Sequence, residues 1–343
     1  MELIKDNVSS LYKYLLNLQN PLRLDSVMEM ALYDKDYGYY SIYNPFENKG
    51  DFITAPKISQ MFGEIVGAFG LSKMLSYNIS KFSLIEIGGG DGTLLNDILK
   101  IIPKDNIADI YLVDNSDLLK SVQQKKLAGY NIKYVNDILD VKTEHPCFIV
   151  ANELFDAMPI RKFKKTGENF FEAYINSDQN ELFIEYKQAN EDFLTYYENV
   201  PENGIIEYPE YALNYLKNIT RLLESQKGFF LTFDYGYLNN EKYIFSMQAI
   251  KNHTMVDWLL NIGSCDITTH VDFKMLMDSL PKEFKSSVTT QGGFLLTNGI
   301  GLRARALIAK NPDKYEIIDN ALSRLTHPKL MGELFKCMLI SNL

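Results

Sequence analysis

A glycine-rich turn after a short apolar segment is the part of the sequence best suited to hold a ligand. The segment 83–87 reads as a buried strand, and Gly88, Gly90 and Gly92 follow it before a helix begins. Glycines are favoured there because a ligand close to the backbone leaves no room for a Cβ atom, and because a tight turn can demand positive φ angles. The N-terminus of the next helix attracts an anionic group. The alternative is a turn with a purely structural role.

The spacing of these glycines separates two classes of cofactor. A dinucleotide-binding turn has the pattern G-x-G-x-x-G and would carry its third glycine at position 93, where this chain has Thr93. Here the pattern is G-x-G-x-G, and Glu86 precedes its first glycine by two residues, where its carboxylate can hold N–H groups of the turn or a ligand amine. The pattern therefore disfavours NAD-linked oxidoreduction, for which the chain also lacks an evident catalytic His or Lys dyad.

Acidic residues also follow the next two predicted strands. Asp114 comes directly after the strand 110–113, and Asp137 comes shortly after the strand 132–135. In an open α/β sheet, ligands lie beyond the carboxyl ends of the strands, where the strand order reverses. Each acid alone would read as a solvated loop residue or a helix cap. Three acids at three successive strand ends, counting the one before the glycines, favour a polar ligand site.

The elements that must position these residues alternate strand with helix from residue 82, which is typical of a parallel sheet covered by helices. Helices are expected over 58–69, 94–102, 118–128 and 208–223. Strands are expected over 83–87, 110–113, 132–135, 147–150, 228–233, 286–290 and 335–340. Three more strands, over 161–165, 170–176 and 182–187, read as antiparallel.

These patterns predict how the chain is organised. We expect an N-terminal helical extension over residues 1–80, with two helices before residue 33, and a core over 81–343 that carries an inserted antiparallel β subdomain at about 160–190. The basic run 161–165 within the insertion reads as an exposed edge strand that its charges protect from aggregation.

The acid followed by G-x-G-x-G resembles the first motif of class I S-adenosylmethionine-dependent methyltransferases. The fold that this resemblance implies is α/β and Rossmann-like, with a seven-stranded, mostly parallel sheet. In that fold the acid that ends the second strand holds the ribose hydroxyls of the cofactor, so the resemblance gives this role to Asp114. It also implies that Asp137 meets the adenine amine.

Several stretches spread over nearly the whole chain resemble one family within that fold, the MidA-like methyltransferases. Besides the glycine turn they are 37–40, 50–64, 151–159, 233–236, 266–273 and 331–336. Mitochondrial members of this family assist the assembly of respiratory complex I by methylating arginine. The resemblance implies S-adenosylmethionine as cofactor, a protein arginine as methyl acceptor, and a segment from Thr54 to Ser59 that folds over the cofactor. The alternative for that segment is a helix N-terminus packed beside the sheet.

Two acids after the fourth strand suit an arginine acceptor. An arginine arrives protonated, and carboxylates that grip its guanidinium can localise the charge on the nitrogens that do not attack. Glu153 and Asp156 would share one side if the segment turns helically, and Asn152 can orient Glu153 or accept from the cofactor. The alternative is a helix N-terminus whose acids face its dipole. After the fifth strand, Asp234 and Tyr235 can line the substrate side or form a hydrogen-bonded corner.

The composition disfavours several other classes of protein. With 46% hydrophobic and 23% charged residues, the 343-residue chain can bury a large core, and its net charge of −9 disfavours sequence-independent nucleic-acid binding. Three distant cysteines and four histidines without helix-spaced partners predict neither a disulfide framework nor a metal site. No apolar run approaches the roughly 18 residues of a membrane span. With no targeting peptide at the start, we expect a cytoplasmic protein, or a mature form in the mitochondrial matrix.

One further class of function stays open. A non-catalytic assembly factor would keep the cofactor pocket for stability while its inserted strands bind a partner protein. The sequence does not distinguish a monomer from a homo-oligomer, and it does not identify the methyl acceptor or the number and symmetry of methyl groups added.

Overall fold

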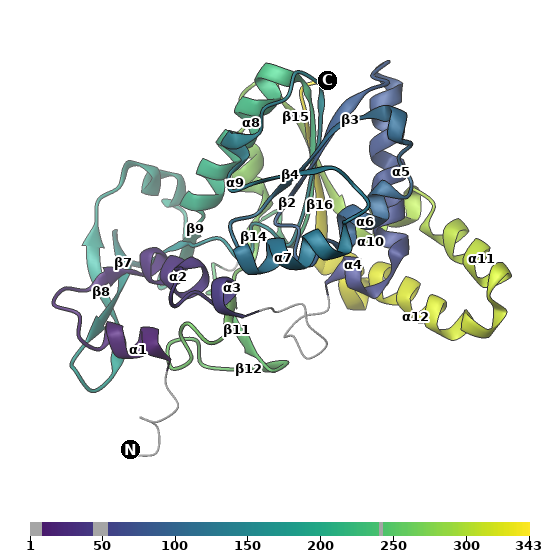
Figure 1. Cartoon of the computed structure of the whole chain (residues 1–343). Coiled ribbons are helices and arrows are strands. Elements are labelled where there is room, and N and C mark those ends of the chain that lie inside the picture. The colour runs from purple at the N-terminus through teal and green to yellow at the C-terminus, as the bar shows by residue number, and fades with distance from the viewer. Residues whose placement is uncertain (1–8, 44–53, 240–242) are drawn as a thin grey trace. The chain divides into compact units, whose positions relative to one another are not determined.

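The computed structural model describes residues 9–43, 54–239 and 243–343, and its elements are labelled in Figure 1. Contacts divide the chain into two compact units. The large unit comprises Ile53–Phe155, Tyr215–Tyr237 and Phe273–Leu343. The small unit comprises Met1–Phe52, Asp156–Asn214 and Leu238–Asp272. This division differs from the expected one at residue 80, because the helices just before the first core strand pack with the large unit and because the small unit is assembled from three separate parts of the chain.

The large unit is built on a sheet whose continuous path runs β15-β16-β10-β5-β2-β3-β4. The strands are β2 (Phe82–Ile87), β3 (Ile107–Val113), β4 (Ile132–Val135), β5 (Cys147–Asn152), β10 (Gly228–Tyr237), β15 (Lys285–Thr290) and β16 (Phe335–Ser341). The pairs from β4 to β10 are parallel, and β16 is antiparallel to both of its neighbours. The strand order reverses between β2 and β5, so ligands are expected beyond the carboxyl ends of these two strands.

Helices cover both faces of this sheet, with α5 and α6 on one side and α8 and α9 on the other (Figure 1). The helices of the large unit, including α8, which begins in the small unit, are α4 (Ala55–Ile58), α5 (Gln60–Ser76), α6 (Thr93–Leu99), α7 (Asp117–Lys126), α8 (Glu210–Gln226), α9 (Phe273–Asp278), α10 (Gln291–Thr297), α11 (Ile300–Lys310) and α12 (Tyr315–Thr326). Because both faces are covered, all six residues of β2 are buried, which explains why most of them are apolar. The main core includes Phe62, Val66, Leu95, Phe148 and Phe233.

The helix expected over 58–69 is interrupted at its start. Ser59 has an extended backbone, with φ −163° and ψ 141°, and its hydroxyl accepts a hydrogen bond from the N–H of Met61 at 3.2 Å. It therefore caps the N-terminus of α5, which is a preferred role of serine. Pro56 lies in the separate short helix α4, where its fixed φ suits the first turn.

A largely buried ion pair joins α5 to α11. Arg303 donates two hydrogen bonds to the carboxylate of Glu64, each 2.7 Å long, and the amide of Gln60 donates a third at 3.1 Å. Glu64 is 6% exposed. Glu64 ends the stretch 50–64, so at least part of that stretch has a structural role.

Replacing Glu64 with Ala should lower the free energy of unfolding by about 2 kcal/mol, because the Arg303 guanidinium then loses both charge-assisted hydrogen bonds. Thermal unfolding followed by circular dichroism measures this loss. As a control, Asp319→Ala removes an exposed acid from α12 and should change the stability by less than about 0.5 kcal/mol. Equal effects of the two substitutions would show that the pair contributes nothing specific.

The small unit contains two antiparallel sheets. The first follows the path β1-β7-β6-β9, with β8 beside β7, and the second follows β12-β11-β13. The strands of these sheets are β1 (Leu22–Arg23), β6 (Arg161–Thr166), β7 (Asn169–Ser177), β8 (Leu182–Ala189), β9 (Ile205–Tyr208), β11 (Gln248–Lys251), β12 (Thr254–Met255) and β13 (Asp266–Thr268). The short strand β14 (Val271–Asp272) belongs to neither sheet, and the helices of the unit are α1 (Ser10–Leu15), α2 (Leu24–Tyr33) and α3 (Tyr39–Ile42). The three strands expected between 160 and 190 are β6, β7 and β8. Apolar side chains of α2 and β7 meet in its core.

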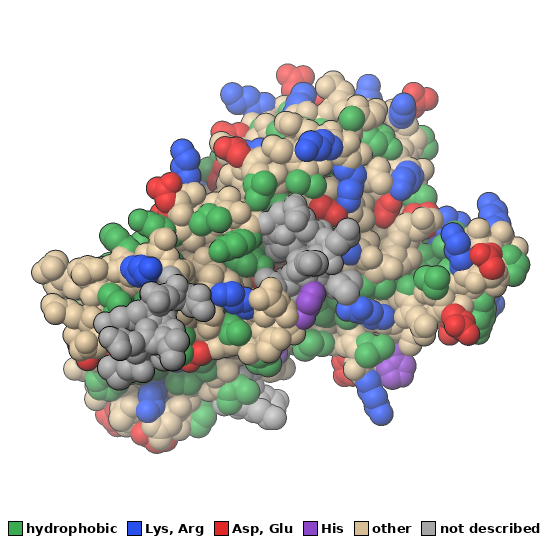
Figure 2. All heavy atoms as spheres, turned by 60° about the horizontal axis from the view of Figure 1, so that its bottom comes forward, with side chains coloured by type: hydrophobic (Ala, Val, Ile, Leu, Met, Phe, Trp, Pro, Cys, Tyr) green, Lys and Arg blue, Asp and Glu red, His purple; other side chains and the backbone are tan. Residues whose placement is uncertain are grey.

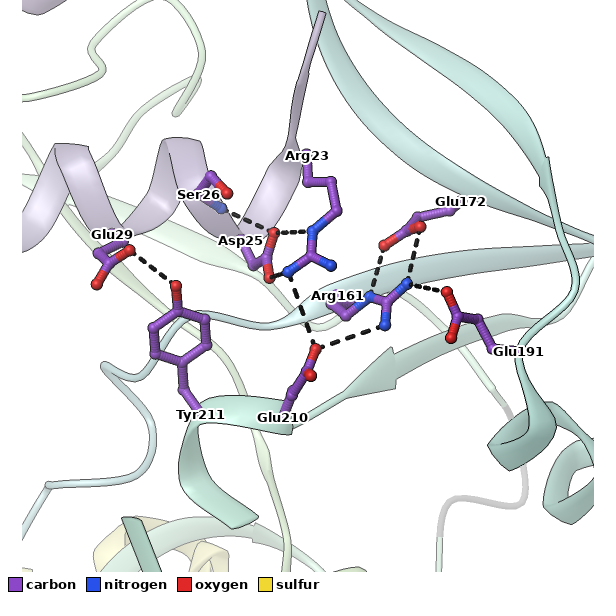
Figure 3. Close-up of polar contacts among 9 residues, drawn as sticks. All are labelled: Arg23, Asp25, Ser26, Glu29, Arg161, Glu172, Glu191, Glu210 and Tyr211. Carbon is purple, nitrogen blue, oxygen red and sulfur yellow. Dashed lines mark hydrogen bonds and ion pairs between the residues drawn. The ribbon is translucent and has the colours of Figure 1, made fainter. Parts of the chain in front are cut away.

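The expectation that residues 161–165 form an exposed edge strand is wrong. Strand β6 lies between β7 and β9, and Arg161 is only 5% exposed. Figure 3 shows why a cation is tolerated there: Glu172, Glu191 and Glu210 surround its guanidinium, with the nearest contact, to Glu172, at 2.6 Å. A buried charge needs such partners. The partners come from distant parts of the sequence, so the basic run alone did not reveal them.

The surface charges, the helices and the possible metal ligands bear on the remaining expectations. On the face shown in Figure 2, basic and acidic side chains are interspersed with apolar ones rather than gathered into broad patches. Within residues 9–43, 54–239 and 243–343, no helix combines the length and the apolar character needed to cross a membrane. The same residues contain no group of three or more His, Cys, Asp and Glu side chains placed to hold a metal ion.

Candidate functional site

The glycine turn that follows β2 adopts a conformation that few residues other than glycine accept. Gly88, Gly90 and Gly92 have φ angles of 64°, 52° and 80°, in the left-handed region. The turn is anchored by the N–H of Gly88, which donates to the carbonyl of Val113 at 2.9 Å, and by the N–H of Gly92, which donates to Gly89 at 2.8 Å. Gly92 then caps α6. The turn is therefore fixed in place at the carboxyl ends of β2 and β3.

Glu86 lies in β2 directly before this turn and is 2% exposed. Burial raises its pKa well above the usual range, and the charges of Asp114 and Asp91 raise it further. The N–H of Leu95 donates to its carboxylate, whereas its Oε2 atom has no hydrogen-bond partner within the described residues. A buried carboxylate with an unused oxygen can accept from a cationic group of a ligand.

Asp114 directly follows β3 and is 8% exposed. Its Oδ1 accepts from the N–H of Ser116 at 2.9 Å, and its Oδ2 accepts from the side-chain amide of Gln123 at 2.8 Å. Burial raises the pKa of Asp114, and these two hydrogen bonds oppose the rise. Each carboxylate oxygen has further lone pairs that can accept from neighbouring hydroxyls.

The first helix after residue 53 is tied to the glycine turn. Lys57 in α4 lies 3.9 Å from a carboxylate oxygen of Asp91, which also contacts Lys126 at 2.8 Å. Burial opposes ionisation of Asp91, but hydrogen bonds from Lys126 and Thr93 outweigh it and lower the pKa. Thr54, half-buried, precedes α4 and makes no capping hydrogen bond with its side chain. The segment that begins at Thr54 thus runs beside the turn, and its role in covering a cofactor stays a prediction.

Asp137 follows β4 as expected, and its Oδ1 accepts from the N–H of Leu139 at 2.9 Å. It therefore caps a short 3-10 turn, which was the alternative for this acid, and a contact with adenine stays a prediction.

The sequence did not point to Tyr215 of α8, which lies close enough to Asp137 and Asp114 for their charges to act on it. Burial raises the pKa of the Tyr215 phenol, and these two acids raise it further.

The segment after β5 is placed beside the glycine turn. In the sheet, Ile87 pairs with Ala151, so Gly88 and Asn152 leave neighbouring strands at the same edge. The side chain of Leu154 lies 3.6 Å from the position that a Cβ atom of Gly88 would take. The residues expected to act on the methyl acceptor therefore begin next to the residues expected to bind the cofactor.

Glu153 holds an unusual backbone conformation at this edge. Its φ angle is 54°, which is left-handed and uncommon for a residue other than glycine. Its N–H donates to the carbonyl of Phe233 at 2.7 Å, and Asn152 Nδ2 donates to Glu153 Oε1 at 2.9 Å. Asn152 Oδ1 is buried and has no partner within the part of the chain that the structure describes. Asn152 thus orients Glu153 and keeps an acceptor unused.

The turn that contains Glu153 is stabilised by Asp234. This residue is 0% exposed, and its Oδ2 accepts from the N–H groups of Leu154 and Phe155 at 3.1 and 2.9 Å. No helix forms over residues 153–159, so the expected helical spacing of Glu153 and Asp156 is wrong. Asp234 instead accepts hydrogen bonds from these N–H groups. It thereby forms the hydrogen-bonded corner that was the alternative to a role on the substrate side. Half-buried Tyr235 packs its ring 5.5 Å from that of Phe335.

Asp156 belongs to the small unit and is 3% exposed. Its carbonyl accepts from the N–H of Thr269 at 2.8 Å. In the same unit, the hydroxyl of Tyr40 donates to Asp266 at 2.8 Å, and the pKa of Tyr40 is raised by burial and then by the charges of Asp266 and Asp156. The contribution of Asp156 to a guanidinium site stays a prediction.

Known proteins resemble this chain over most of its length. Residues 66–290 match the family described as "Putative S-adenosyl-L-methionine-dependent methyltransferase". The rat protein named protein arginine methyltransferase NDUFAF7, mitochondrial, is 27% identical over 370 residues, which cover 94% of this chain and 81% of the rat protein. The Caenorhabditis elegans homologue of that name is 28% identical over 356 residues, which cover 90% of this chain and 81% of the worm protein.

A solved structure shows the same fold. A protein from Burkholderia thailandensis, crystallised bound to S-adenosyl-homocysteine, superimposes with a TM-score of 0.82 at 20% identity, over 99% of this chain and 92% of that one. The described residues fit such a ligand, because the glycines of the turn present backbone without side chains, Glu86 has an unused buried oxygen that can accept from an amine, and Asp114 has acceptors for hydroxyls. The chain belongs to the family of S-adenosyl-L-methionine-dependent methyltransferases that this match defines, and S-adenosylmethionine is its cofactor.

Proposed function

We propose that this chain transfers a methyl group from S-adenosylmethionine to an arginine side chain of a protein. The observation that supports the proposal is the strained turn at Glu153, which lies at the sheet edge where the glycine turn begins and has an unused amide acceptor next to it on Asn152. Strained backbone persists where the surroundings enforce it, and such sites cluster where function requires them. The names of the rat and worm relatives support arginine as the acceptor.

The residues have separable tasks in this reaction. Bound S-adenosylmethionine supplies a methyl group on a positively charged sulfur. Glu86 receives the cofactor amine, Asp114 receives the ribose hydroxyls, and Asp137 meets the adenine amine. The glycine turn admits the ligand close to the backbone.

The acceptor side is held by the residues after β5. Glu153 and Asp156 grip the guanidinium and localise its charge away from the attacking nitrogen. A protonated guanidinium that gains a methyl cation must lose one proton. The carboxylate of Glu153 also accepts this proton. Asn152 keeps that carboxylate oriented, and half-buried Tyr235 lines the substrate side.

The proposed acceptor is an arginine on a protein such as a subunit of respiratory complex I, in the cytoplasm or, for a mature organellar form, in the mitochondrial matrix. The rat and worm relatives of the chain are both named mitochondrial. The test uses the purified chain, S-adenosylmethionine with a radiolabelled methyl group, and a protein extract from cells that lack the chain. After total hydrolysis, we expect the label in methylated arginine.

Other outcomes of this assay distinguish the alternatives. Label in lysine, histidine or a small molecule would overturn the choice of acceptor while leaving methyl transfer intact. No label, together with retained cofactor binding, would favour the non-catalytic assembly factor. The Glu153→Ala variant serves as the control for methylation by contaminating enzymes.

The raised pKa of Glu86 predicts a pH dependence. A bound cationic amine favours the ionised carboxylate, so affinity for S-adenosylhomocysteine should rise as the pH increases through the raised pKa of Glu86. In the ligand-free protein the sign is opposite: an acid with a raised pKa favours the folded state most at low pH, and this contribution declines as the pH rises. Glu86→Gln should therefore raise the melting temperature at neutral pH, weaken binding and flatten its pH dependence. Calorimetric titration at several pH values measures this, and an unchanged pH profile in the variant would contradict it.

A further inference from the structure

We infer that Gln123 is a positioning residue for the cofactor, because its side-chain amide fixes the acid that follows β3 to the glycine turn that follows β2. The inference rests on the cofactor site and not on the choice of arginine as acceptor. It assigns a task to a residue of helix α7 that the motifs of the sequence do not include.

One amide group makes both connections. Gln123 Nε2 donates to Asp114 Oδ2 at 2.8 Å and to the carbonyl of Gly90 at 2.9 Å, and Gln123 is 0% exposed. A backbone carbonyl and an ionised carboxylate only accept hydrogen bonds, so the amide nitrogen must face them, and the reversed orientation would oppose oxygen to oxygen. The two amide hydrogens of a single side chain thereby set the positions of two separate parts of the site.

The oxygen atom of this amide shows that the arrangement lowers the stability of the fold. Gln123 Oε1 is buried and has no hydrogen-bond partner within residues 9–43, 54–239 and 243–343. An unsatisfied buried acceptor destabilises a fold, and an apolar residue would avoid this cost. Gln123 stands one helical turn from Leu119 and from Leu127, both of which are buried, so an apolar side chain would also continue the buried stripe. Stability alone therefore does not explain a glutamine here.

The helix that carries Gln123 lies against the turn. A Cβ atom added to Gly92 would lie 3.6 Å from the Cα atom of Gln123 and 3.1 Å from the side chain of Leu127. Since the backbone of α7 is this close, the amide has little freedom to move away from its two acceptors. Asp114 Oδ1 is held independently by the N–H of Ser116, so Gln123 fixes the second oxygen and with it the rotation of the carboxylate.

This geometry gives Gln123 an indirect effect on the ligand. A pair of ribose hydroxyls requires the carboxylate in one orientation, and the adjacent backbone must stay where the turn places it. Without the amide, the Asp114 carboxylate can rotate, and the carbonyl of Gly90 loses its buried donor. The cofactor would then meet a site whose two halves are no longer aligned.

The test compares Gln123→Met with a matched variant, Gln291→Met. Methionine keeps the length and volume of glutamine but cannot donate to either partner. Gln291 in α10 is also 0% exposed, also has an unpartnered Oε1, and donates to the carbonyl of Leu325 at 3.0 Å rather than to a residue assigned to the cofactor. It controls for the loss of a buried amide in the same unit.

Calorimetric titration with S-adenosylhomocysteine and with its 2′-deoxy analogue gives the readout. Gln123→Met should weaken binding of S-adenosylhomocysteine by about 10- to 100-fold, the loss expected for a hydrogen bond to a charged group. It should also reduce the preference of the wild-type chain for the ribose form over the deoxy form, because that preference depends on an oriented Asp114. Gln291→Met should change neither quantity, although both variants should melt at a different temperature from the wild type.

Three outcomes would overturn the inference. Wild-type affinity in Gln123→Met, measured below the melting temperatures of all variants, would show that the amide has no role in binding. Equal weakening in both variants, with the preference for the ribose form retained, would show a general loss of packing. Failure of the wild type to bind S-adenosylhomocysteine would overturn the cofactor site as well. Normal binding results together with no methylated arginine would leave this inference intact and overturn the proposed function alone.

Discussion

Replacing Gly90 with Val should weaken binding of S-adenosylmethionine and S-adenosylhomocysteine by at least about 100-fold, as expected when a left-handed turn is rebuilt and a ligand obstructed. Gly90 has a φ angle of 52°, which a β-branched side chain tolerates poorly, and its carbonyl accepts the buried hydrogen bond from Gln123. The added side chain would also occupy space that the ligand needs beside the turn. Calorimetric titration at a temperature where the variant is folded measures the loss.

A second glycine provides the control for this substitution. A Cβ atom at Gly129 would meet nothing within 4 Å, and its φ angle lies outside the left-handed region. Gly129→Val should therefore bind both ligands as the wild type does. NAD should bind to none of the three proteins, because the turn lacks the dinucleotide spacing. Wild-type affinity in Gly90→Val would contradict the placement of the cofactor at this turn.

Replacing Glu153 with Gly should reduce the rate of methyl transfer by at least about 1000-fold, as expected when a group that both binds and accepts a proton is removed. The same substitution should stabilise the chain, by about 1 kcal/mol, because glycine adopts a φ angle of 54° without the strain that Glu153 bears. Single-turnover methylation and thermal unfolding measure the two effects. A lower rate of methyl transfer together with a higher stability would indicate that Glu153 is retained for its chemical role.

Asp234→Ala provides the complementary result. It leaves the N–H groups of Leu154 and Phe155 without their acceptor, so we expect both the activity and the stability to fall. Affinity for S-adenosylhomocysteine should change little in either variant, because neither residue is assigned to the cofactor. Full turnover in Glu153→Gly would refute the catalytic role of Glu153, and unchanged stability would refute the strain.

The positions of the residues assigned to the cofactor could be predicted from local sequence. The turn at Gly88–Gly92, the buried acid Glu86 and the acid Asp114 lie in or directly after short, largely apolar strands, so their positions at one edge of the sheet follow from the pattern. The three antiparallel strands between 160 and 190 were equally accessible, because their turns and alternation are local features.

What the sequence did not reveal depends on contacts between distant residues. Arg161 is buried because acids from other strands and helices reach it, and no window around β6 contains them all. The turn at Glu153 lacks a helix because Asp234, far along the chain, supplies the hydrogen-bond acceptor for its N–H groups. Gln123 left one signal, a polar residue within the buried stripe of α7, which becomes meaningful only when its two acceptors are known.

The central claim is that the carboxyl ends of β2 and β3 hold the cofactor, and a crystal structure of the chain with S-adenosylhomocysteine tests it most directly. We expect the ligand against the turn at Gly88–Gly92, with its ribose hydroxyls on Asp114 and its amine within reach of Glu86. Ligand density at another part of the large unit, or at this edge with Asp114 and Glu86 both free of it, would contradict the account.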